Sequence, residues 1–404
     1  MASNVSGTIR ELGRAAEPYI IERRRHFHRH PELSLREFET TDAIARELDA
    51  MGIPYEHPLE TGLVATLAGT AADAYRADGT PRRRLLIRAD IDALPVTERT
   101  GEPFASVNEG VMHACGHDCH IAMQLGALKI LSRLRDELHG EVRAVFQPSE
   151  ENGGGSKLMI DAGVCDGVDG AYAAHIWSEV QAGTVSCEPG PRMANTDWFR
   201  IDIRGTSCHG AMPQRGADAV MAAAEIVNAL QTIVSREISP YEPAVVTVGE
   251  IHGGTARNVI AGSAYLTGTV RTYSDTAHQM MPELIKRIVT HTAMALGAEA
   301  ELTDYTVANL KVENEPASAQ RGRDALVKVL GEQAVGTYRG TLSGEDFSAY
   351  LQELPGALAF VGCRNPQIGA TFAQHSCFYK VDETVLARGS MFAAQYAIDF
   401  LAEA

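Results

Sequence analysis

Three absences in this sequence each exclude a class of protein. No apolar run approaches the roughly 20 residues that a membrane-spanning helix needs. The stretch from Met1 to Arg14 is polar and mixed in charge, without the apolar core of a secretory signal. Basic residues number 36 against 52 acidic ones, and the net charge of -16 argues against nucleic acid or an anionic membrane as the main partner. We expect a cytoplasmic protein.

A paired cysteine framework is also missing. The seven cysteines are odd in number and are scattered from Cys115 to Cys377. A small secreted scaffold would carry an even set at regular spacings. The pattern therefore favours free or metal-bound thiols in a reducing compartment.

What is present is an ordinary globular composition on a long chain. Hydrophobic residues make up 45% and charged residues 22% of the 404 residues. A chain of this length exceeds one ordinary core, so two domains are expected.

Strand and helix patterns alternate in the first half of the chain. Helices are predicted at 20–30, 38–51, 121–135 and 156–162, and strands at 63–67, 85–88, 142–146 and 171–175. Polar residues gather just after the strands, which places a site at the carboxyl edge of an α/β sheet. We therefore predict a mixed sheet with flanking helices.

From about Arg192 the pattern changes. Strands are predicted at 198–204, 244–251, 264–273 and 298–305, with long helices at 217–236 and 276–296. This β-α-β-β-α-β order is that of a ferredoxin-like α+β unit. We predict an inserted domain at 192–306 that divides a catalytic domain into 1–191 and 307–404, with a terminal helix at 388–401.

The stretch from His113 to His120 holds three imidazoles, two thiols and one carboxylate in eight residues. Cys115 and His117 flank Gly116, so a turn there can direct a thiolate and an imidazole at one ion. An isolated pair at this spacing would more often belong to a core. The clustering favours metal ligation, because a core would not tolerate so many unsatisfied polar groups. Three neighbours are expected to orient the ligands: His113, Asp118 and His120.

Two pairs of carboxylates follow apolar strands. Glu150 and Glu151 come after a strand and a proline and run into three glycines. We assign Glu150 as a general base and Glu151 as a metal ligand, since nearby cations lower and burial raises a carboxylate pKa. Asp90 and Asp92 project to the same side of a strand end, where either a turn pair or a ligand-orienting carboxylate fits.

Three further histidines are candidates of unequal strength. His175 ends a predicted strand, where a satisfied core histidine and a metal ligand are equally common. The pattern around His375 alone favours a structural role. His209 belongs to the inserted domain and can reach the ions only if that domain closes over the site.

Taken together, the motifs of this chain resemble the dinuclear-metal amidohydrolases, a family that includes hippurate hydrolases, auxin-conjugate hydrolases, N-acetyldiaminopimelate deacetylases and bacterial aminoacylases or carboxypeptidases. The resemblance spans nearly the whole chain. It is carried by Arg29-His-Pro-Glu-Leu33, Arg88-Ala-Asp-Ile-Asp-Ala-Leu-Pro95, His113-Ala-Cys-Gly-His-Asp118, Phe146-Gln-Pro-Ser-Glu-Glu151, His175-Ile-Trp177, His209-Gly-Ala211, Ser343-Gly-Glu-Asp-Phe347 and His375-Ser376.

The resemblance implies a zinc-peptidase-like catalytic domain that binds two divalent metal ions. Glu150 then transfers the proton, and Asp92 supports the metal site. Zinc or manganese is expected, with nickel or cobalt as alternatives. The implied ligands are Cys115, His117, Glu151, His175 and His375.

For the inserted domain, the resemblance implies a lid that also forms a homodimer. His209 would stabilise the oxyanion, often in the active site of the partner subunit. Asn258 would contact the substrate carboxylate, with Arg271 assisting it. The chain departs from the family at Ala261, where proline is usual, and at Cys377, where a small residue or proline is usual. Both changes could reshape the substrate pocket.

The predicted function is hydrolysis of the amide bond of an N-acyl amino acid or short peptide. An exopeptidase of the same fold stays open, because both reactions cut an amide beside a free carboxylate. A metal-bearing binding protein without turnover would not need Glu150 or His209. A thiol redox protein would use Cys115 and Cys119, but their separation is not the Cys-x-x-Cys arrangement of redox folds.

Overall fold

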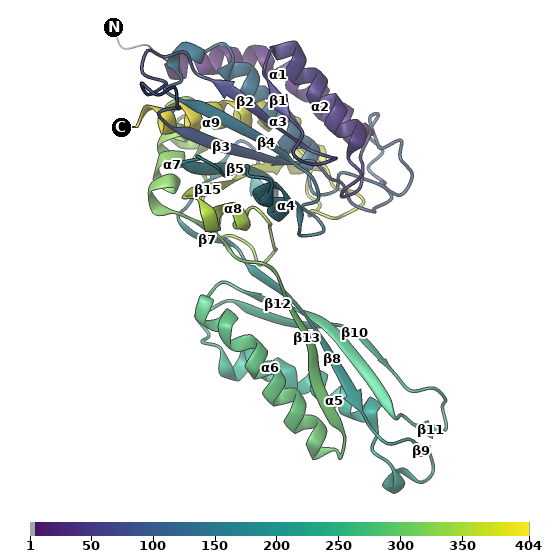
Figure 1. Ribbon diagram of the computed structural model, residues 1–404. Coiled ribbons are helices and arrows are strands. Elements are labelled where there is room, and N and C mark those ends of the chain that lie inside the picture. Colours follow the sequence, from purple (N-terminus) through teal and green to yellow (C-terminus); the bar gives the residue numbers. More distant parts are fainter. Residues whose placement is uncertain (1–4, 404) are drawn as a thin grey trace. The chain divides into compact units, whose positions relative to one another are not determined.

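The computed structural model describes residues 5–403, which divide into two compact units (Figure 1). Unit 1 contains the chain up to Arg192, the segment Glu313–Arg339 and the chain from Asp346 onward. Unit 2 contains Met193–Val312 and Gly340–Glu345.

Unit 1 is built on a seven-stranded mixed sheet, which confirms the predicted α/β class. The central ladders β3–β4, β3–β5 and β5–β15 are parallel, whereas β1–β2, β2–β4 and β15–β6 are antiparallel. In sheet order the strands are β1 (Tyr55–Glu56), β2 (Leu63–Ala68), β4 (Glu141–Gln147), β3 (Arg84–Asp90), β5 (Gly170–Gln181), β15 (Gly356–Arg364) and β6 (Val185–Ser186).

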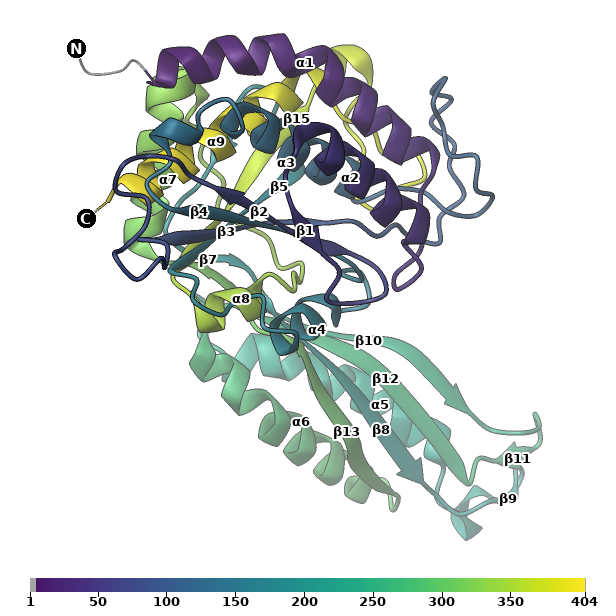
Figure 2. The same ribbon diagram turned by 45° about the horizontal axis from the view of Figure 1, so that its top comes forward.

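Helices cover both faces of this sheet (Figure 2). The larger group packs together on one face: α1 (Val5–Arg29), α2 (Phe38–Met51), α3 (His117–Leu131), α7 (Pro316–Leu330) and α9 (Leu386–Ala402). Two short helices in contact with each other lie on the other: α4 (Gly155–Asp161) and α8 (Ser348–Glu353). Helix α3 is buried on nearly all sides because it contacts β3 as well as α1 and α9.

The first helix is much longer than the sequence pattern indicated. A helix was predicted to begin at Ile20, but α1 begins at Val5 and continues through Pro18. Ile9, Ala16, Ile20 and Phe27 form a buried stripe along it. The packing of this stripe stabilises the helix despite the proline, which on sequence grounds favours a break.

Unit 2 has the predicted β-α-β-β-α-β order, with β8 (Asn195–Arg204), α5 (Ala219–Thr232), β10 (Ala244–Gly253), β12 (Ser263–Thr272), α6 (Asp275–Ala295) and β13 (Glu299–Asn309). The strands form an antiparallel sheet in the order β10-β12-β8-β13, and both helices pack on one face of it (Figure 1). A π-helical turn, Ile233–Glu237, extends α5. A separate ladder of unit 2 pairs β9 (Cys208–His209) with β11 (Val259–Ile260). A further ladder pairs β7 (Gly190–Met193) with β14 (Val312–Asn314), and most of its residues belong to unit 1.

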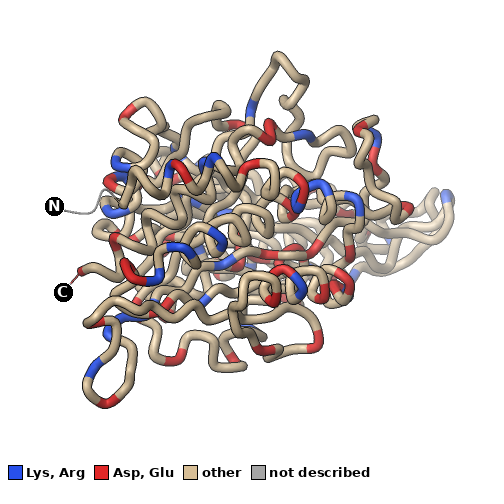
Figure 3. Tube along the Cα trace, turned by 90° about the horizontal axis from the view of Figure 1, so that it is seen from above, with Lys and Arg blue, Asp and Glu red and all other residues tan. Residues whose placement is uncertain are grey.

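Charged residues of both signs are interspersed along the chain (Figure 3). Within residues 5–403, no helix combines the length and apolar character that crossing a membrane requires.

Candidate metal centre

The candidate site lies where the parallel strands of unit 1 end. Asp90 is the last residue of β3 and Gln147 the last of β4. In the ladder between β3 and β5, Arg88 pairs with Ala173, which places Asp90 at the level of His175. His175 does not end its strand as predicted, because β5 continues to Gln181 along its partner β15. The side chains that follow β3 and β4 therefore meet the middle of β5.

Gly116 turns the chain between Cys115 and His117. Its φ of 102° is in the left-handed region, and a Cβ there would lie 2.4 Å from Cγ2 of Ile176. Only glycine fits this turn without displacement. His117 then begins α3, and potential ligand atoms of Cys115, His117 and His175 lie within 4.8 Å of one another.

Hydrogen bonds fix the rings of two histidines so that Nε2 faces the site. Nδ1 of His117 lies 3.0 Å from the carbonyl oxygen of Asp92, and Nδ1 of His175 lies 2.7 Å from that of Ile176. A carbonyl can only accept, so each Nδ1 donates, and Nε2 is the nitrogen of each ring that can bind an ion in place of a proton. Nε2 of His175 is 3.6 Å from the Cys115 sulfur. Both imidazoles are therefore oriented as metal ligands.

The electrostatics around His117 favour a positive charge. Burial lowers the pKa of His117, but the carboxylates of Asp90 and Asp92 outweigh burial and hold it well above its ordinary value. Carboxylates that stabilise a proton on Nε2 would equally stabilise a cation bound to it. By contrast, burial and the neighbouring His120 hold the pKa of His175 well below its ordinary value, so its ring is neutral.

The Glu151 carboxylate lies between His117 and His375. Its Oε1 lies 3.7 Å from Nε2 of His117, and its Oε2 lies 3.5 Å from Nε2 of His375. Burial raises the pKa of Glu151 to about 7, although His117 partly opposes the effect. Cys115, Glu151 and His375 form a second donor set, which shares Cys115 with the first.

His375 reaches the site through an unusual backbone conformation. Its φ is 66°, and its N–H donates to the carbonyl oxygen of Ala114 at 2.8 Å. This bond ties the distant 375 segment to the residue before Cys115. Its side chain is 57% exposed, so this edge of the site opens to solvent. The structure thus brings together all five predicted ligands.

The residues fit a pair of divalent cations. Nε2 of His117 and Oε1 of Glu151 are buried and have no hydrogen-bond partner among the described residues. Buried polar atoms of this kind are rare unless a ligand satisfies them. Thiolate, imidazole and carboxylate donors together suit zinc and its transition-metal neighbours.

The Asp92 carboxylate orients one ligand of each donor set. It accepts hydrogen bonds from Nδ1 of His117 at 3.1 Å, the Glu151 N–H at 3.0 Å and the Ser34 hydroxyl at 2.7 Å. Burial alone would raise the pKa of Asp92, but the bond from His117 holds it below its ordinary value. Of the two readings left open by the sequence, this geometry fits the orienting carboxylate.

Replacing Asp92 by Asn should weaken metal binding by about 10- to 100-fold, because the amide puts an NH2 group in place of the oxygen that accepts from either His117 or Glu151, and it removes the carboxylate charge. Competition with a chelator of known affinity measures the change. The control is Asp136→Asn, an exposed aspartate on the short helix Arg135–Glu137. Equal affinity in both variants would mean that Asp92 serves only the fold.

The group of Asp90, His117 and His120 is close enough for a third ion, but both ring nitrogens of His120 are already used. His120 Nδ1 donates to Asp90 at 2.5 Å, and its Nε2 accepts the Ile176 N–H at 2.9 Å. His120 therefore orients neighbours and cannot bind an ion. Asp118 likewise contacts Arg24 and His28, both at 2.8 Å.

Glu150 lies beside the donors. One of its oxygens lies within 4.8 Å of ligand atoms of His117 and Glu151. Its Oε1 accepts the Asp346 N–H at 3.4 Å, and the residue is half-buried. A carboxylate in this position can reach a water molecule held between the two donor sets.

In unit 2 the structure brings His209 and Asn258 together. β9 pairs His209 with Val259, and the Gly210 N–H donates to the Asn258 carbonyl at 2.8 Å. Both side chains are exposed. Arg271 lies at the far end of β12, about 26 Å along the strand from Ser263 at about 3.3 Å per residue. Within one chain, Arg271 is therefore not placed to assist Asn258.

Several supporting residues were not singled out from the sequence. Ser34 binds Asp92, and the Glu37 carboxylate accepts the Ser149 N–H at 2.9 Å. Nothing in the local pattern distinguished them. Arg88, Gln147 and Asp346 do lie in the quoted motifs, and their clustering at strand ends was the available signal.

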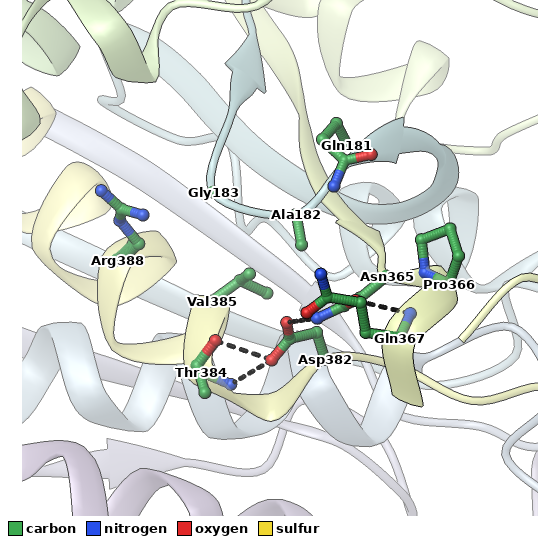
Figure 4. A pocket seen from close by; sticks show the side chains of 10 residues that line it. All are labelled: Gln181, Ala182, Gly183, Asn365, Pro366, Gln367, Asp382, Thr384, Val385 and Arg388. Atoms are coloured by element: carbon green, nitrogen blue, oxygen red, sulfur yellow. Dashed lines mark hydrogen bonds between the residues drawn. The ribbon is translucent and has the colours of Figure 1, made fainter. Parts of the chain in front are cut away.

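A hollow of about 430 Å³ in unit 1 lacks the chemistry of the metal centre (Figure 4). Among its lining residues the carboxylate is Asp382, which accepts from Asn365 at 2.7 Å and from the Thr384 N–H and hydroxyl. The lining of this hollow contains no histidine or cysteine. The metal centre is thus the better candidate for catalysis.

Comparisons with known sequences and structures agree on one family of peptidases and related hydrolases. The sequence model of peptidase family M20/M25/M40 matches residues 86–399. The Saccharolobus solfataricus protein named thermostable carboxypeptidase 1 is 36% identical over 405 residues, 99% of each chain. The Geobacillus stearothermophilus N-acyl-L-amino acid amidohydrolase is 44% identical over 289 residues, 71% of this chain and 76% of that protein. The solved Bacillus subtilis YXEP protein, described as a dinuclear metal binding peptidase, has a TM-score of 0.83 at 33% identity and covers 96% and 99% of the two chains.

Proposed function

This chain belongs to peptidase family M20/M25/M40, and from that premise we propose that it is a metal-dependent hydrolase that cleaves the amide bond of N-acyl amino acids. The observation that carries the proposal is the meeting of two donor sets at Cys115, with Glu150 beside them. A structural metal site would have no use for a carboxylate placed next to the ligands.

Two divalent ions would be held by the five ligands, and Cys115 belongs to both donor sets. Zinc or manganese suits the donors, as do nickel and cobalt. When bound, such ions polarise a substrate carbonyl and lower the pKa of water toward neutrality.

Glu150 is proposed to carry the proton through the reaction. It takes a proton from the attacking water and returns it to the nitrogen of the leaving amine. The Asp346 N–H donates to Oε1 and so restrains the carboxylate of Glu150. Asp92 keeps His117 and Glu151 aligned meanwhile, because it accepts from both.

His209 is proposed to donate to the oxyanion that develops on the carbonyl oxygen. The Ala211 N–H donates to its Nδ1 at 3.0 Å, so Nδ1 is an acceptor and Nε2 carries the proton of the neutral ring. Nε2 is thereby prepared as a donor. Asn258, on the neighbouring turn, is proposed to contact the substrate carboxylate. A substrate role for Arg271 stays a prediction separate from Asn258.

The domain roles follow from the same proposal. The predicted catalytic domain, 1–191 and 307–404, corresponds to unit 1, and the predicted lid, 192–306, corresponds to unit 2, which also takes in the chain up to Val312 and Gly340–Glu345. The lid would supply His209 and join two subunits. Lid closure would exclude water and complete the site, so turnover would follow domain motion. We also propose a cytoplasmic location, in keeping with the unpaired cysteines.

A second candidate is an exopeptidase that removes a C-terminal residue. It is favoured by the similarity to thermostable carboxypeptidase 1, which extends over 99% of both chains. Both reactions need an amide carbonyl at the metals and a free carboxylate nearby. Only the group on the acyl side differs.

The test is hydrolysis of N-acetyl and N-benzoyl amino acids, compared with short peptides, by protein stripped with a chelator and reconstituted with single metals. Activity should vanish on chelation and return with at least one of zinc, manganese, nickel or cobalt. Faster cleavage of N-acyl amino acids supports the amidohydrolase, and faster cleavage of peptides the exopeptidase. Two bound ions without hydrolysis of any substrate would indicate a binding protein.

A further inference from the structure

A buried cluster of charged and polar side chains lies beside the metal centre, and the reaction proposed above assigns these side chains no role. Arg88 on β3 is 5% exposed, and Asp346 is 1% exposed. Arg88 bonds Asp346 at 2.6 Å and Asp90 at 2.6 Å, and its Nε donates to Gln147 at 2.9 Å. Ionised groups this deeply buried require firm partners, so the cluster is rigid.

The Asp346 carboxylate receives donors from three elements. Its Oδ1 accepts from Arg88 on β3 and from Gln147 on β4, the latter at 2.9 Å. Its Oδ2 accepts from Gln147 at 2.8 Å and from the Ser156 N–H of α4 at 2.9 Å. Charge-assisted hydrogen bonds of this kind hold a side chain in one position.

Two of these donors lie at the ends of the loop that carries the catalytic carboxylates. Gln147 ends β4, Ser156 lies in the first turn of α4, and Glu150 and Glu151 lie between them. A Cβ on Gly155 would come within 1.6 Å of the Pro148 carbonyl oxygen, so the loop is tightly closed. The Asp346 carboxylate therefore joins both ends of this loop.

The same residue also contacts Glu150 directly through its backbone, since the Asp346 N–H donates to Oε1 of Glu150 at 3.4 Å. The position of that N–H depends on where the carboxylate is anchored. Anchoring the side chain thus fixes the loop and the oxygen of Glu150 together.

We infer that Asp346, held by Arg88 and Gln147, is a positioning residue that sets the Glu150 carboxylate for proton transfer. The inference rests on the proposed function for the identity of the reaction. In this role Asp346 acts through Glu150.

The test is Asp346→Asn, which puts an NH2 group where at least one donor now points. We expect kcat to fall about 10- to 100-fold, because small misplacements of a reacting group have effects of this size. KM should change by less than about threefold and metal content should stay at the wild-type level, since the ligands keep their own contacts. Backbone amides of residues 148–156 should exchange hydrogen for deuterium faster.

The matched control breaks an ion pair between the same two strands at the opposite end. Arg84 on β3 bonds Glu141 on β4 at 2.7 Å, and Glu141 is 9% exposed. Glu141→Gln should lower the melting temperature but leave kcat within about twofold, since β3 spans about 20 Å at about 3.3 Å per residue. If Asp346→Asn does not fold, Gln147→Met removes a neutral donor from the same carboxylate and should lower kcat with the same split from KM.

The outcomes separate this inference from the proposed function. Wild-type kcat and exchange rates in Asp346→Asn, or an equal loss in Glu141→Gln, would overturn it, as would loss of metal in step with activity. If wild-type protein hydrolyses no amide, the proposed function fails. The exchange measurement needs no substrate and still decides whether Asp346 fixes the loop.

Discussion

Replacing Glu150 by Gln should lower kcat by about 10³- to 10⁴-fold while both ions remain bound. The amide can neither take a proton from water nor return one to the leaving amine, and a positioned acid–base group contributes about 10² to 10⁴. The metal content of the variant must be measured as well, because Glu150 lies close enough to His117 and Glu151 to act as a ligand. Metal content by elemental analysis, together with kcat on an N-acetyl amino acid, measures both effects.

The control for this variant is Glu353→Gln, an exposed glutamate at the end of α8. It makes the same chemical change outside the site and should leave kcat and metal content as in the wild type. Near-normal turnover of the Glu150→Gln protein would rule out its role as the proton carrier. Loss of one ion would instead assign Glu150 as a ligand.

His209→Ala should reduce kcat about 10²- to 10³-fold, the usual effect of removing one oxyanion donor. Metal binding should not change, because His209 belongs to unit 2 and is absent from the donor sets. His291→Ala, an exposed histidine on α6 of the same unit, is the control and should retain wild-type kcat.

Mixing the two inactive variants tests the proposed dimer. If the lid of one subunit serves the site of the other, a mixed dimer of His209→Ala and Glu150→Gln contains one site with both residues intact. Activity should then rise on mixing to a fraction of the wild-type value, with light scattering as the measure of the dimer. A dimer that gains no activity on mixing would place His209 in the site of its own subunit, and a monomer would exclude the shared site.

The secondary structure was predicted well where local patterns decide it. The apolar stretches at 85–88 and 142–146 are strands, and the order of elements in unit 2 is as predicted. Errors arose where packing overrides local preference. Helix α1 continues through Pro18 because a stripe of buried residues holds it, and β5 runs beyond His175 because β15 pairs with it.

The sequence by itself determined the chemistry of the site: a thiol, imidazoles and adjacent carboxylates placed after strands, in a pattern that resembles one enzyme family. These facts depend on residue types and short spacings, which are local. Only the tertiary structure decided which groups are free to bind. Nε2 of His117 has no hydrogen-bond partner among the described residues, whereas Nε2 of His120 accepts one. His375 lies close to Cys115, and Arg271 lies far along its strand from the turn that carries Asn258. The physical reason is that hydrogen bonds between distant segments depend on strand register and helix packing, which short spacings along one chain do not specify.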